Sequence, residues 1–337
     1  MANIHDIAKL AQVSPATVSR AFNQPGALSP QTLQRVRQTA QQMNYQPNSD
    51  ARNLRRGGRA AVKQTQTIGY IAVAKTIIQG DPFSQELFGA IVAATTERGY
   101  GLRVVAAAPD GDLPRAVMQH EVDGVICRFT SPMLREVARA MPAVSLDYHD
   151  PQAEGYAVVP DYEGGLRIVM ERLLAAGRRR IALMANNPDK LQQRGFWHIF
   201  PKTCRQAYLD HGLPPPDNLF LGAAADPAQG YALGMAAFGE ASRRPDAVIG
   251  PDAAMLGLYR AAYERRVRIS DDIAIVGING LRLGEHMAPP LTTLDVNVRL
   301  MGSTAVDILL DTIQTGTQRR GLEITPVNLV VRGSALL

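Results

Sequence analysis

Small or polar side chains and one arginine share one face of a segment near the N-terminus. This face carries Ala16, Thr17, Ser19, Arg20 and Asn23. Hydroxyl and amide groups can hydrogen-bond to phosphate oxygens, and an arginine can donate two hydrogen bonds to the edge of a guanine. The chemistry that this face favours is therefore recognition of a nucleic acid.

Two short helices joined by a tight turn would position that face. The first has Asn3 as a candidate N-cap and apolar residues at helical spacing, namely Ile4, Ile7, Ala8 and Ala11. The second begins at Ser14-Pro15, a capping residue followed by proline at the first helical position. A third helix is predicted from Ser29-Pro30. The arrangement is typical of a helix-turn-helix unit, although a helical hairpin in any protein core would share it.

The net charge of +5 is unevenly distributed along the 337 residues. Residues 1–60 hold eight basic and two acidic side chains, a net charge of +6, so the rest of the chain carries −1. Positive potential is thus confined to the segment that carries the polar face, as binding of a polyanion requires.

After a polar linker at residues 59–67, apolar strand-like runs alternate with helical segments. The predicted strands are 67–74, 101–107, 124–127, 143–147, 157–159, 180–184, 247–249 and 273–277. The helices predicted between them are 83–98, 113–120, 133–140, 162–176, 203–211, 227–242 and 253–266. The alternation predicts parallel, doubly wound α/β sheets in two lobes, with a break near Val159-Pro160 and a ligand cleft where their strands end.

Other classes of protein lack support in the sequence. No apolar run is long enough to cross a membrane, and the first residues show no export signal. Cys127 and Cys204 are isolated, as expected in a reducing cytoplasm. The histidines are scattered, and neither a dinucleotide fingerprint nor a phosphate-binding loop is present. We therefore expect a cytoplasmic protein that is not an enzyme, has no cofactor, no metal site and no membrane partner.

Three N-terminal segments and six core segments resemble the lactose/galactose-repressor family of bacterial transcription factors. The N-terminal segments are IHDIAKLAQVSPATVSRAFN, YQPN and ARNLRRG. The core segments are IGYIAV, VDGVICRF, AVSLDY, DYEGGLRIVMERLLAAGRRRIALM, DDIAIVGING and PPLTTLDVN. The resemblance covers nearly the whole chain. It implies a homodimeric repressor that binds palindromic double-stranded operator DNA and is controlled by a small-molecule effector.

The resemblance also implies a division into domains. An all-α helix-turn-helix head at 1–46 and a hinge helix with linker at 47–66 would precede a two-lobed α/β core like that of periplasmic binding proteins. The N-terminal lobe would comprise 67–159 and 291–318, and the C-terminal lobe 160–290 and 319–337. A helix at 296–314 and an edge strand at 326–331 are expected in these late segments.

In the head, the resemblance assigns roles in DNA binding. Ser19, Asn23 and the backbone amides at the helix start would contact phosphates, and Arg20 and its neighbours at the helix N-terminus would read base edges. Ser14 and Thr17 would also contact the DNA. Pro15 and Ala16 stand where relatives read the outer bases, and Ala16 can pack on a thymine methyl.

In the hinge, which would become helical only on DNA, three more residues would contribute to binding. Asn48 would lie at its start, Ala51 would pack against the partner hinge, and Leu54 would wedge into a minor-groove step. Alternatively, Leu54 is an ordinary apolar residue of a short amphipathic helix.

In the core, residues that follow strands are candidates for effector binding. Asp81 and Phe83 follow the first strand, and Asp252 and Asn279 follow later ones. Phe83 could instead be the first core residue of its helix, and Asp252 a simple helix N-cap. Asn279 stands where relatives usually carry aspartate.

A longer, aromatic-rich stretch supplies two further effector candidates, Arg194 and Trp197. The alignment there is ambiguous, and Arg194 could equally be a surface residue. Trp197 could replace an aromatic platform that relatives have where this chain has Ala223-Ala224-Ala225.

The residues themselves do not identify the effector. The family resemblance implies a sugar or sugar derivative, including a sugar phosphate, with a nucleoside or another small polar metabolite as alternatives. A periplasmic solute-binding protein would share the core but would need an export signal and no head. A sugar-modifying enzyme would need an acid–base pair. The sequence has no C-terminal heptad tail, which favours a dimer over a tetramer.

Overall fold

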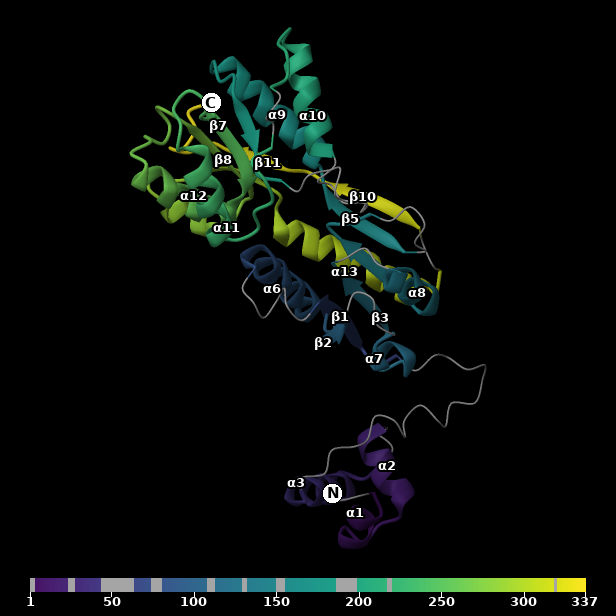
Figure 1. Cartoon of the computed structure of the whole chain (residues 1–337). Helices are drawn as coiled ribbons and strands as arrows, with labels where there is room; N and C mark the ends of the chain where they lie inside the picture. Colours follow the sequence, from purple (N-terminus) through teal and green to yellow (C-terminus); the bar gives the residue numbers. More distant parts are fainter. Residues whose placement is uncertain are drawn as a thin grey trace. The chain divides into compact units, whose positions relative to one another are not determined.

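In a computed structural model, the chain divides into two compact units, the head (Met1–Lys63) and the core (Gln64–Leu337) (Figure 1). The structure describes residues 4–23, 28–43, 64–73, 81–107, 113–128, 132–149, 155–185, 199–216, 220–317 and 320–337. The predicted hinge lies almost entirely outside these ranges.

The head is built from three helices, α1 (Ile4–Leu10), α2 (Pro15–Asn23) and α3 (Pro30–Gln42). Ile7, Val18 and Val36, one from each helix, are fully buried in a common cluster. The Ser14 hydroxyl accepts a hydrogen bond from the Thr17 backbone N–H at 3.1 Å, which satisfies a donor at the start of α2. The helix-turn-helix prediction is confirmed.

The first sheet of the core has six strands in the order β10-β5-β4-β3-β1-β2, all paired in parallel. They are β1 (Thr67–Val73), β2 (Gly101–Ala107), β3 (Gly124–Cys127), β4 (Ala143–Leu146), β5 (Tyr156–Pro160) and β10 (Gly321–Thr325). Along β1, Ile68 and Tyr70 belong to one buried cluster and Ile71 to another, because successive side chains point to opposite faces.

Helices cover both faces of this sheet. On one face, α6 (Pro82–Glu97) and α13 (Val298–Thr315) lie side by side (Figure 1). On the other face, α7 (Arg115–Met118) and α8 (Pro132–Ala140) pack on β1, β2 and β3.

The second sheet has five strands in the order β11-β9-β8-β7-β6, all parallel except β11. They are β6 (Ile181–Leu183), β7 (Ala247–Pro251), β8 (Ala274–Asn279), β9 (Thr292–Asp295) and β11 (Asn328–Val330). One face is covered by α9 (Tyr162–Ala175) and α10 (Ile199–Asp210), the other by α11 (Pro227–Ala237) and α12 (Asp252–Glu264). The short 3-10 helix η4 (Arg282–His286) follows β8.

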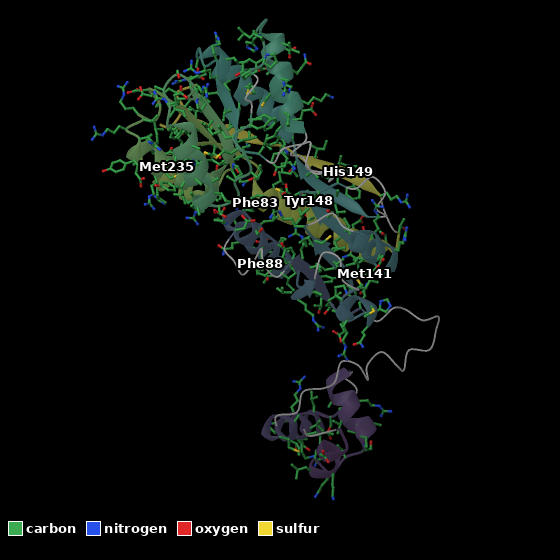
Figure 2. The ribbon with its side chains drawn as sticks, viewed as in Figure 1. Phe83, Phe88, Met141, Tyr148, His149 and Met235 are labelled. Atoms are coloured by element: carbon green, nitrogen blue, oxygen red, sulfur yellow. The ribbon has the colours of Figure 1, made fainter. Side chains whose placement is uncertain are left out.

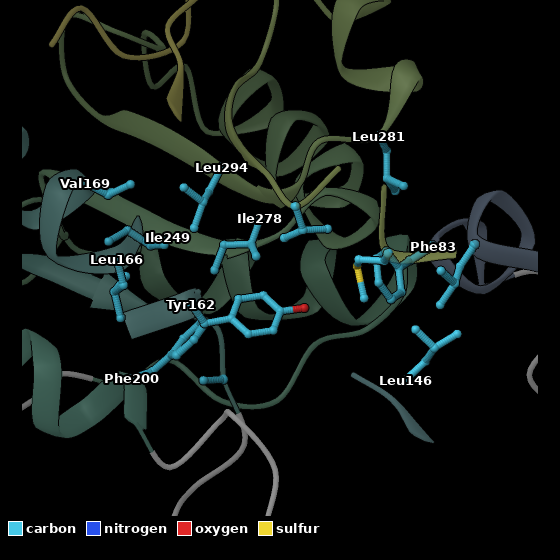
Figure 3. Close-up of a cluster of buried hydrophobic side chains, with 14 of the residues drawn as sticks. Phe83, Leu146, Tyr162, Leu166, Val169, Phe200, Ile249, Ile278, Leu281 and Leu294 are labelled. Atoms are coloured by element: carbon cyan, nitrogen blue, oxygen red, sulfur yellow. The ribbon is translucent and has the colours of Figure 1, made fainter. Parts of the chain in front are cut away.

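A single hydrophobic cluster runs through both lobes. Figure 3 shows Leu146 of β4 together with Tyr162 of α9 and Ile278 of β8. The two lobes therefore share buried apolar surface, and this continuity fixes the strand ends of one sheet close to those of the other.

The strand pairings correct two parts of the predicted lobe boundaries. β9 pairs with β8 in the second sheet, although residues 291–318 were assigned to the N-terminal lobe, and β10 pairs with β5 in the first sheet, although residues 319–337 were assigned to the C-terminal lobe. Both strands are short, and neither has the apolar run that marks a strand in sequence, because β9 is largely polar and β10 is largely exposed. Two other predictions agree with the structure. The helix predicted for the N-terminal lobe is α13, which packs on the first sheet, and the edge strand predicted for the C-terminal lobe is β11, at the edge of the second sheet.

Candidate functional site

The outer face of α2 presents the polar residues that the sequence singled out. Ser14, Pro15, Ala16 and Arg20 are exposed, and Thr17 is half-buried with its hydroxyl 2.9 Å from that of Ser14. Ser19 and Asn23 belong to the same helix, but their side chains are not described. Asn48, Ala51 and Leu54 lie outside the described residues.

A pocket of about 380 Å³ in the core lies where strands of both sheets end. Its described lining consists of Asp81, Phe83, Arg128, Asp147, Tyr148, Met184, Ala185, Ala223, Ala224, Ala225, Gln229, Pro251, Ala253 and Asn279. Phe83 and Tyr148 are labelled in Figure 2. Because most of these residues lie at or just beyond the carboxyl ends of parallel strands, the pocket occupies the usual ligand position of such sheets.

A larger groove of about 760 Å³ lies elsewhere in the second lobe, beside the amino end of β6. Its lining is largely apolar, with Phe220, Leu221 and Leu233, and includes Arg180 and Arg243. We assign the ligand to the smaller pocket because several polar side chains from different strands converge there, as in typical ligand sites.

Three of the predicted effector residues line the smaller pocket, namely Asp81, Phe83 and Asn279. The three alanines at 223–225 also line it. Asn279 adopts a φ of 117°, a conformation that side chains rarely take and that is frequent at functional sites. Arg194 and Trp197 lie outside the described residues.

Phe83 is only 3% exposed, and the guanidinium carbon of Arg128 lies 4.5 Å from its ring centroid. One face of the ring is therefore already covered by a cation–π contact. Figure 3 shows Phe83 in the buried hydrophobic cluster. Its packing role, which the sequence left as an alternative, is thus present in the structure alongside its position on the pocket wall.

Arg128, which the sequence did not single out, forms the centre of the polar end of the pocket. Its Nη1 donates hydrogen bonds to Asp81 Oδ2 at 3.1 Å and to Ser84 Oγ at 2.6 Å. Its Nε and Nη2 both donate to Asp147 Oδ2, at 3.2 and 3.0 Å. Burial alone would lower the pKa of Arg128, but Asp147, Tyr148 and Asp81 raise it above its ordinary value, so the guanidinium is charged.

Asp147 connects this end of the pocket to the second lobe. Its side chain is 1% exposed, and its Oδ1 accepts a hydrogen bond from the Tyr162 hydroxyl at 2.7 Å. Tyr162 begins α9, which packs on the second sheet, whereas Asp147 follows β4 of the first. Burial raises the pKa of Asp147, while Arg128 and Tyr162 act in the opposite direction. The contact is therefore a buried hydrogen bond between the lobes.

Sequence reasoning missed four lining residues with polar side chains, Arg128, Asp147, Tyr148 and Gln229. Arg128 directly follows β3, and Asp147 directly follows β4. The position of a polar residue immediately after a buried strand was the available signal, the same one that selected Asp252 and Asn279.

Asp252 does not line the pocket. It is fully buried, its Oδ1 accepts from the Thr293 hydroxyl at 2.7 Å, and its Oδ2 accepts from the Leu281 backbone N–H at 2.6 Å. At Gly277, an added Cβ would overlap Oδ1. The effector contact predicted for Asp252 is therefore not supported, because both carboxylate oxygens are engaged in tying β7 to β8 and β9. The N-cap of α12 is Pro251, so Asp252 does not occupy the cap position either.

Burial raises the pKa of Asp252 to about 7, although the Thr293 and Leu281 hydrogen bonds and Arg332 lower it. The folded core then keeps this proton to a higher pH than the unfolded chain, whose carboxyl has the ordinary value of 3.8. We expect the free energy of unfolding to fall as the pH rises from about 4 to about 7, by up to ~1.4 kcal/mol per pH unit.

The Asp252→Asn variant isolates this contribution, since asparagine does not titrate. Urea unfolding of both proteins across this pH range should show the wild type losing stability relative to the variant as the pH rises. Parallel pH profiles would contradict the raised pKa.

None of the helices in the described part of the chain is long and apolar enough to cross a membrane.

The three-helix head and the two-sheet core with its pocket define a protein with a DNA-binding unit and a periplasmic-binding-protein-like ligand core. Residues 3–48 match the model of bacterial regulatory proteins of the lacI family, and residues 170–335 match that of the periplasmic binding protein-like domain. The chain belongs to the LacI family of bacterial transcriptional regulators. Repressors of this family are DNA-binding regulators controlled by small-molecule effectors bound in the core domain.

Individual relatives span almost the whole chain. The ribose operon repressor of Escherichia coli K12 is 30% identical over 99% of this chain and 100% of its own length. The HTH-type transcriptional repressor PurR of Aliivibrio fischeri MJ11 is 28% identical over 100% of this chain and 99% of its own length. Among solved structures, the lac repressor dimer bound to operator and the anti-inducer ONPF matches with a TM-score of 0.81 and 26% identity, over 100% of this chain and 99% of that one.

Proposed function

We propose that the chain is a homodimeric, cytoplasmic repressor that binds a palindromic operator and changes its operator affinity when a sugar or sugar derivative enters the core pocket. The observation that carries the proposal is that one pocket is lined by residues of both lobes, such as Arg128 and Asn279. A ligand that contacts both lobes has different affinities for different lobe arrangements, and such a difference is what shifts a conformational equilibrium.

The head would occupy residues 1–46, and the hinge with its linker residues 47–66. Arg20 would read a base edge from α2, supported by its exposure, while Ser19 and Asn23 would position the helix on the phosphates. Ser14 and Thr17 would also contact the DNA. Pro15 and Ala16 would face the outer bases. Asn48, Ala51 and Leu54 would form the hinge contact, with Leu54 inserted at a central pyrimidine–purine step, which is the cheapest to unstack.

The core would bind the effector through the described pocket. Asp81, Phe83 and Asn279 keep the effector-binding role that the sequence suggested, supported by their place on the wall, and Arg194 and Trp197 remain proposed contributors. A sugar is supported by the name of the E. coli relative, a ribose operon repressor. The two carboxylates of the described lining, Asp81 and Asp147, are both paired with Arg128, which argues against acid–base catalysis.

Arg20→Ala tests the proposed base contact. A bidentate arginine–guanine contact contributes about 1–3 kcal/mol of discrimination, so the variant should lose that much affinity and relax preference at one position of each half-site. Selection from randomised half-sites, followed by operator titration, measures both effects.

Arg37→Ala is the matched control, because Arg37 is exposed on α3 rather than α2. It should leave the base preference unchanged. Equal preferences in the wild type and the Arg20 variant would show that Arg20 contacts only phosphate. A wild-type DNA affinity that depends neither on the operator sequence nor on the salt concentration would contradict the proposed function as a whole.

A further inference from the structure

The charges at the polar end of the pocket are already paired with one another. Among the lining residues that the structure describes, Arg128 is the only cation, and Asp81 and Asp147 are the only anions, so this lining carries a net charge of −1. The Arg128 side chain is 20% exposed, and those of Asp81 and Asp147 are 33% and 1% exposed. The excess negative charge therefore lies where solvent screens it poorly.

The donors of Arg128 are largely occupied. A guanidinium has five N–H groups, and the hydrogen bonds to Asp81, Ser84 and Asp147 use four of them. To hold a phosphate through two N–H bonds, Arg128 would have to give up at least one of these four hydrogen bonds. Releasing Asp147 would leave a buried charge without its partner, which is strongly unfavourable.

The Phe83 ring further restrains the guanidinium, because Arg128 lies over it at 4.5 Å. Asp81 is held independently of Arg128, since its Oδ1 accepts from the Phe83 backbone N–H at 3.2 Å and its Oδ2 from the Ser84 hydroxyl at 2.5 Å. Among the described lining residues, an incoming anion would thus face two carboxylates that are fixed in place and an arginine that cannot turn toward it without breaking several contacts.

Hydroxyl groups suit this arrangement better than anionic groups. A hydroxyl can both donate and accept, so it can donate to a carboxylate lone pair and accept from the remaining Nη2 N–H without adding charge. An ammonium group can donate to the carboxylates in the same way and would also offset the net negative charge.

We propose that the Asp81–Arg128–Asp147 cluster is a specificity determinant that makes the pocket reject anionic ligands, so that the effector is an uncharged or amino-substituted polyol and not its phosphate or carboxylate. This inference rests on the proposed function, because it concerns the ligand of the same pocket. It selects between the sugar and sugar-phosphate alternatives that the sequence leaves open.

The test uses matched pairs that differ only in the phosphate, namely D-ribose with D-ribose 5-phosphate and D-glucose with D-glucose 6-phosphate. Each compound is added to the full chain, and binding is measured by isothermal titration and by the shift in melting temperature. We expect at least one neutral sugar to bind, with its phosphate binding about 100-fold more weakly, because the repulsion between like charges several ångströms apart near a protein surface is of that order.

Asp81→Asn tests the cluster itself. Asparagine keeps the side-chain oxygen that caps α6 but removes one negative charge, so the preference for the neutral sugar should shrink by about tenfold or more. Asp307→Asn, at an exposed position of α13 paired with Arg98, is the matched control and should leave the preference unchanged.

Three outcomes would overturn the inference. They are a phosphate that binds as tightly as its neutral sugar, an unchanged preference in a folded Asp81→Asn protein, and a panel in which no neutral sugar binds. Operator binding by the ligand-free protein is measured in parallel. If the ligand-free protein binds the operator normally but shows no preference for the neutral sugar over its phosphate, only the inference about the pocket is rejected. If the protein prefers the neutral sugar but bound sugar leaves operator affinity unchanged, the proposed function is rejected instead.

Discussion

Asp147→Ala is expected to lower the free energy of unfolding of the core by about 3–5 kcal/mol, as removal of one partner from a buried ion pair typically does. The variant would leave Arg128 with Asp81 as its only carboxylate and would deprive the Tyr162 hydroxyl of its acceptor. Because the Tyr162 hydrogen bond joins the two lobes, the loss should affect both. Urea unfolding followed by circular dichroism measures the change.

Asp307→Ala provides the comparison at a surface site. Asp307 accepts hydrogen bonds from Arg98 Nε and Nη2 at 2.6 and 2.7 Å, but its side chain is 62% exposed. Exposed pairs contribute roughly 0–1 kcal/mol because water and salt screen them. Similar losses in the Asp147 and Asp307 variants would show that the Asp147 pair is not buried in solution.

Gly257→Ala is expected to destabilise the core by about 3 kcal/mol, at the upper end of ordinary overpacking. Gly257 lies in α12, where an added Cβ would overlap the Pro227 carbonyl oxygen and the Tyr231 backbone nitrogen of α11. Backbone atoms cannot rotate aside as a side chain can, so the two helices would have to separate. The same close approach occurs at Gly230, where a Cβ would overlap the Ala254 carbonyl.

Gly89→Ala is the matched helical control, because a Cβ at this exposed position of α6 would meet no atom within 4 Å. There the substitution should be stabilising by roughly 0.5–1 kcal/mol, since alanine loses less backbone freedom on folding. Thermal melting of both variants gives the comparison. A Gly257 variant as stable as the Gly89 variant would mean that α11 and α12 do not pack this closely.

The sequence by itself determined the local structure of this protein. Ser14-Pro15 marks the start of α2, where Ser14 caps the helix by accepting a hydrogen bond from the backbone N–H of Thr17, three residues further along the chain. Apolar runs mark β1, β3 and β7, and the helical segments between them follow from the spacing of apolar residues. These features depend on neighbours in the chain, so they can be read without knowing the fold.

Strand membership was decided by tertiary structure. β9 pairs with β8, and β10 pairs with β5, which lies far away in the sequence. The residues of β9 are largely polar and those of β10 largely exposed, so neither segment shows the apolar run that predicts a strand. The lobe to which each belongs follows from pairing, which involves backbone groups that every residue possesses.

The pocket shows the same division most clearly. Asp81, Asn279 and Asp252 all follow strands, and from the sequence they were equivalent candidates for ligand contact. Only the fold turns Asp252 inward, where Thr293 and the Leu281 N–H meet its two oxygens and Gly277 leaves room for them. Likewise, only the fold brings Arg128 between two carboxylates that lie 47 and 19 residues away along the chain. A side chain's partners depend on its direction and on distant backbone, and local sequence determines neither.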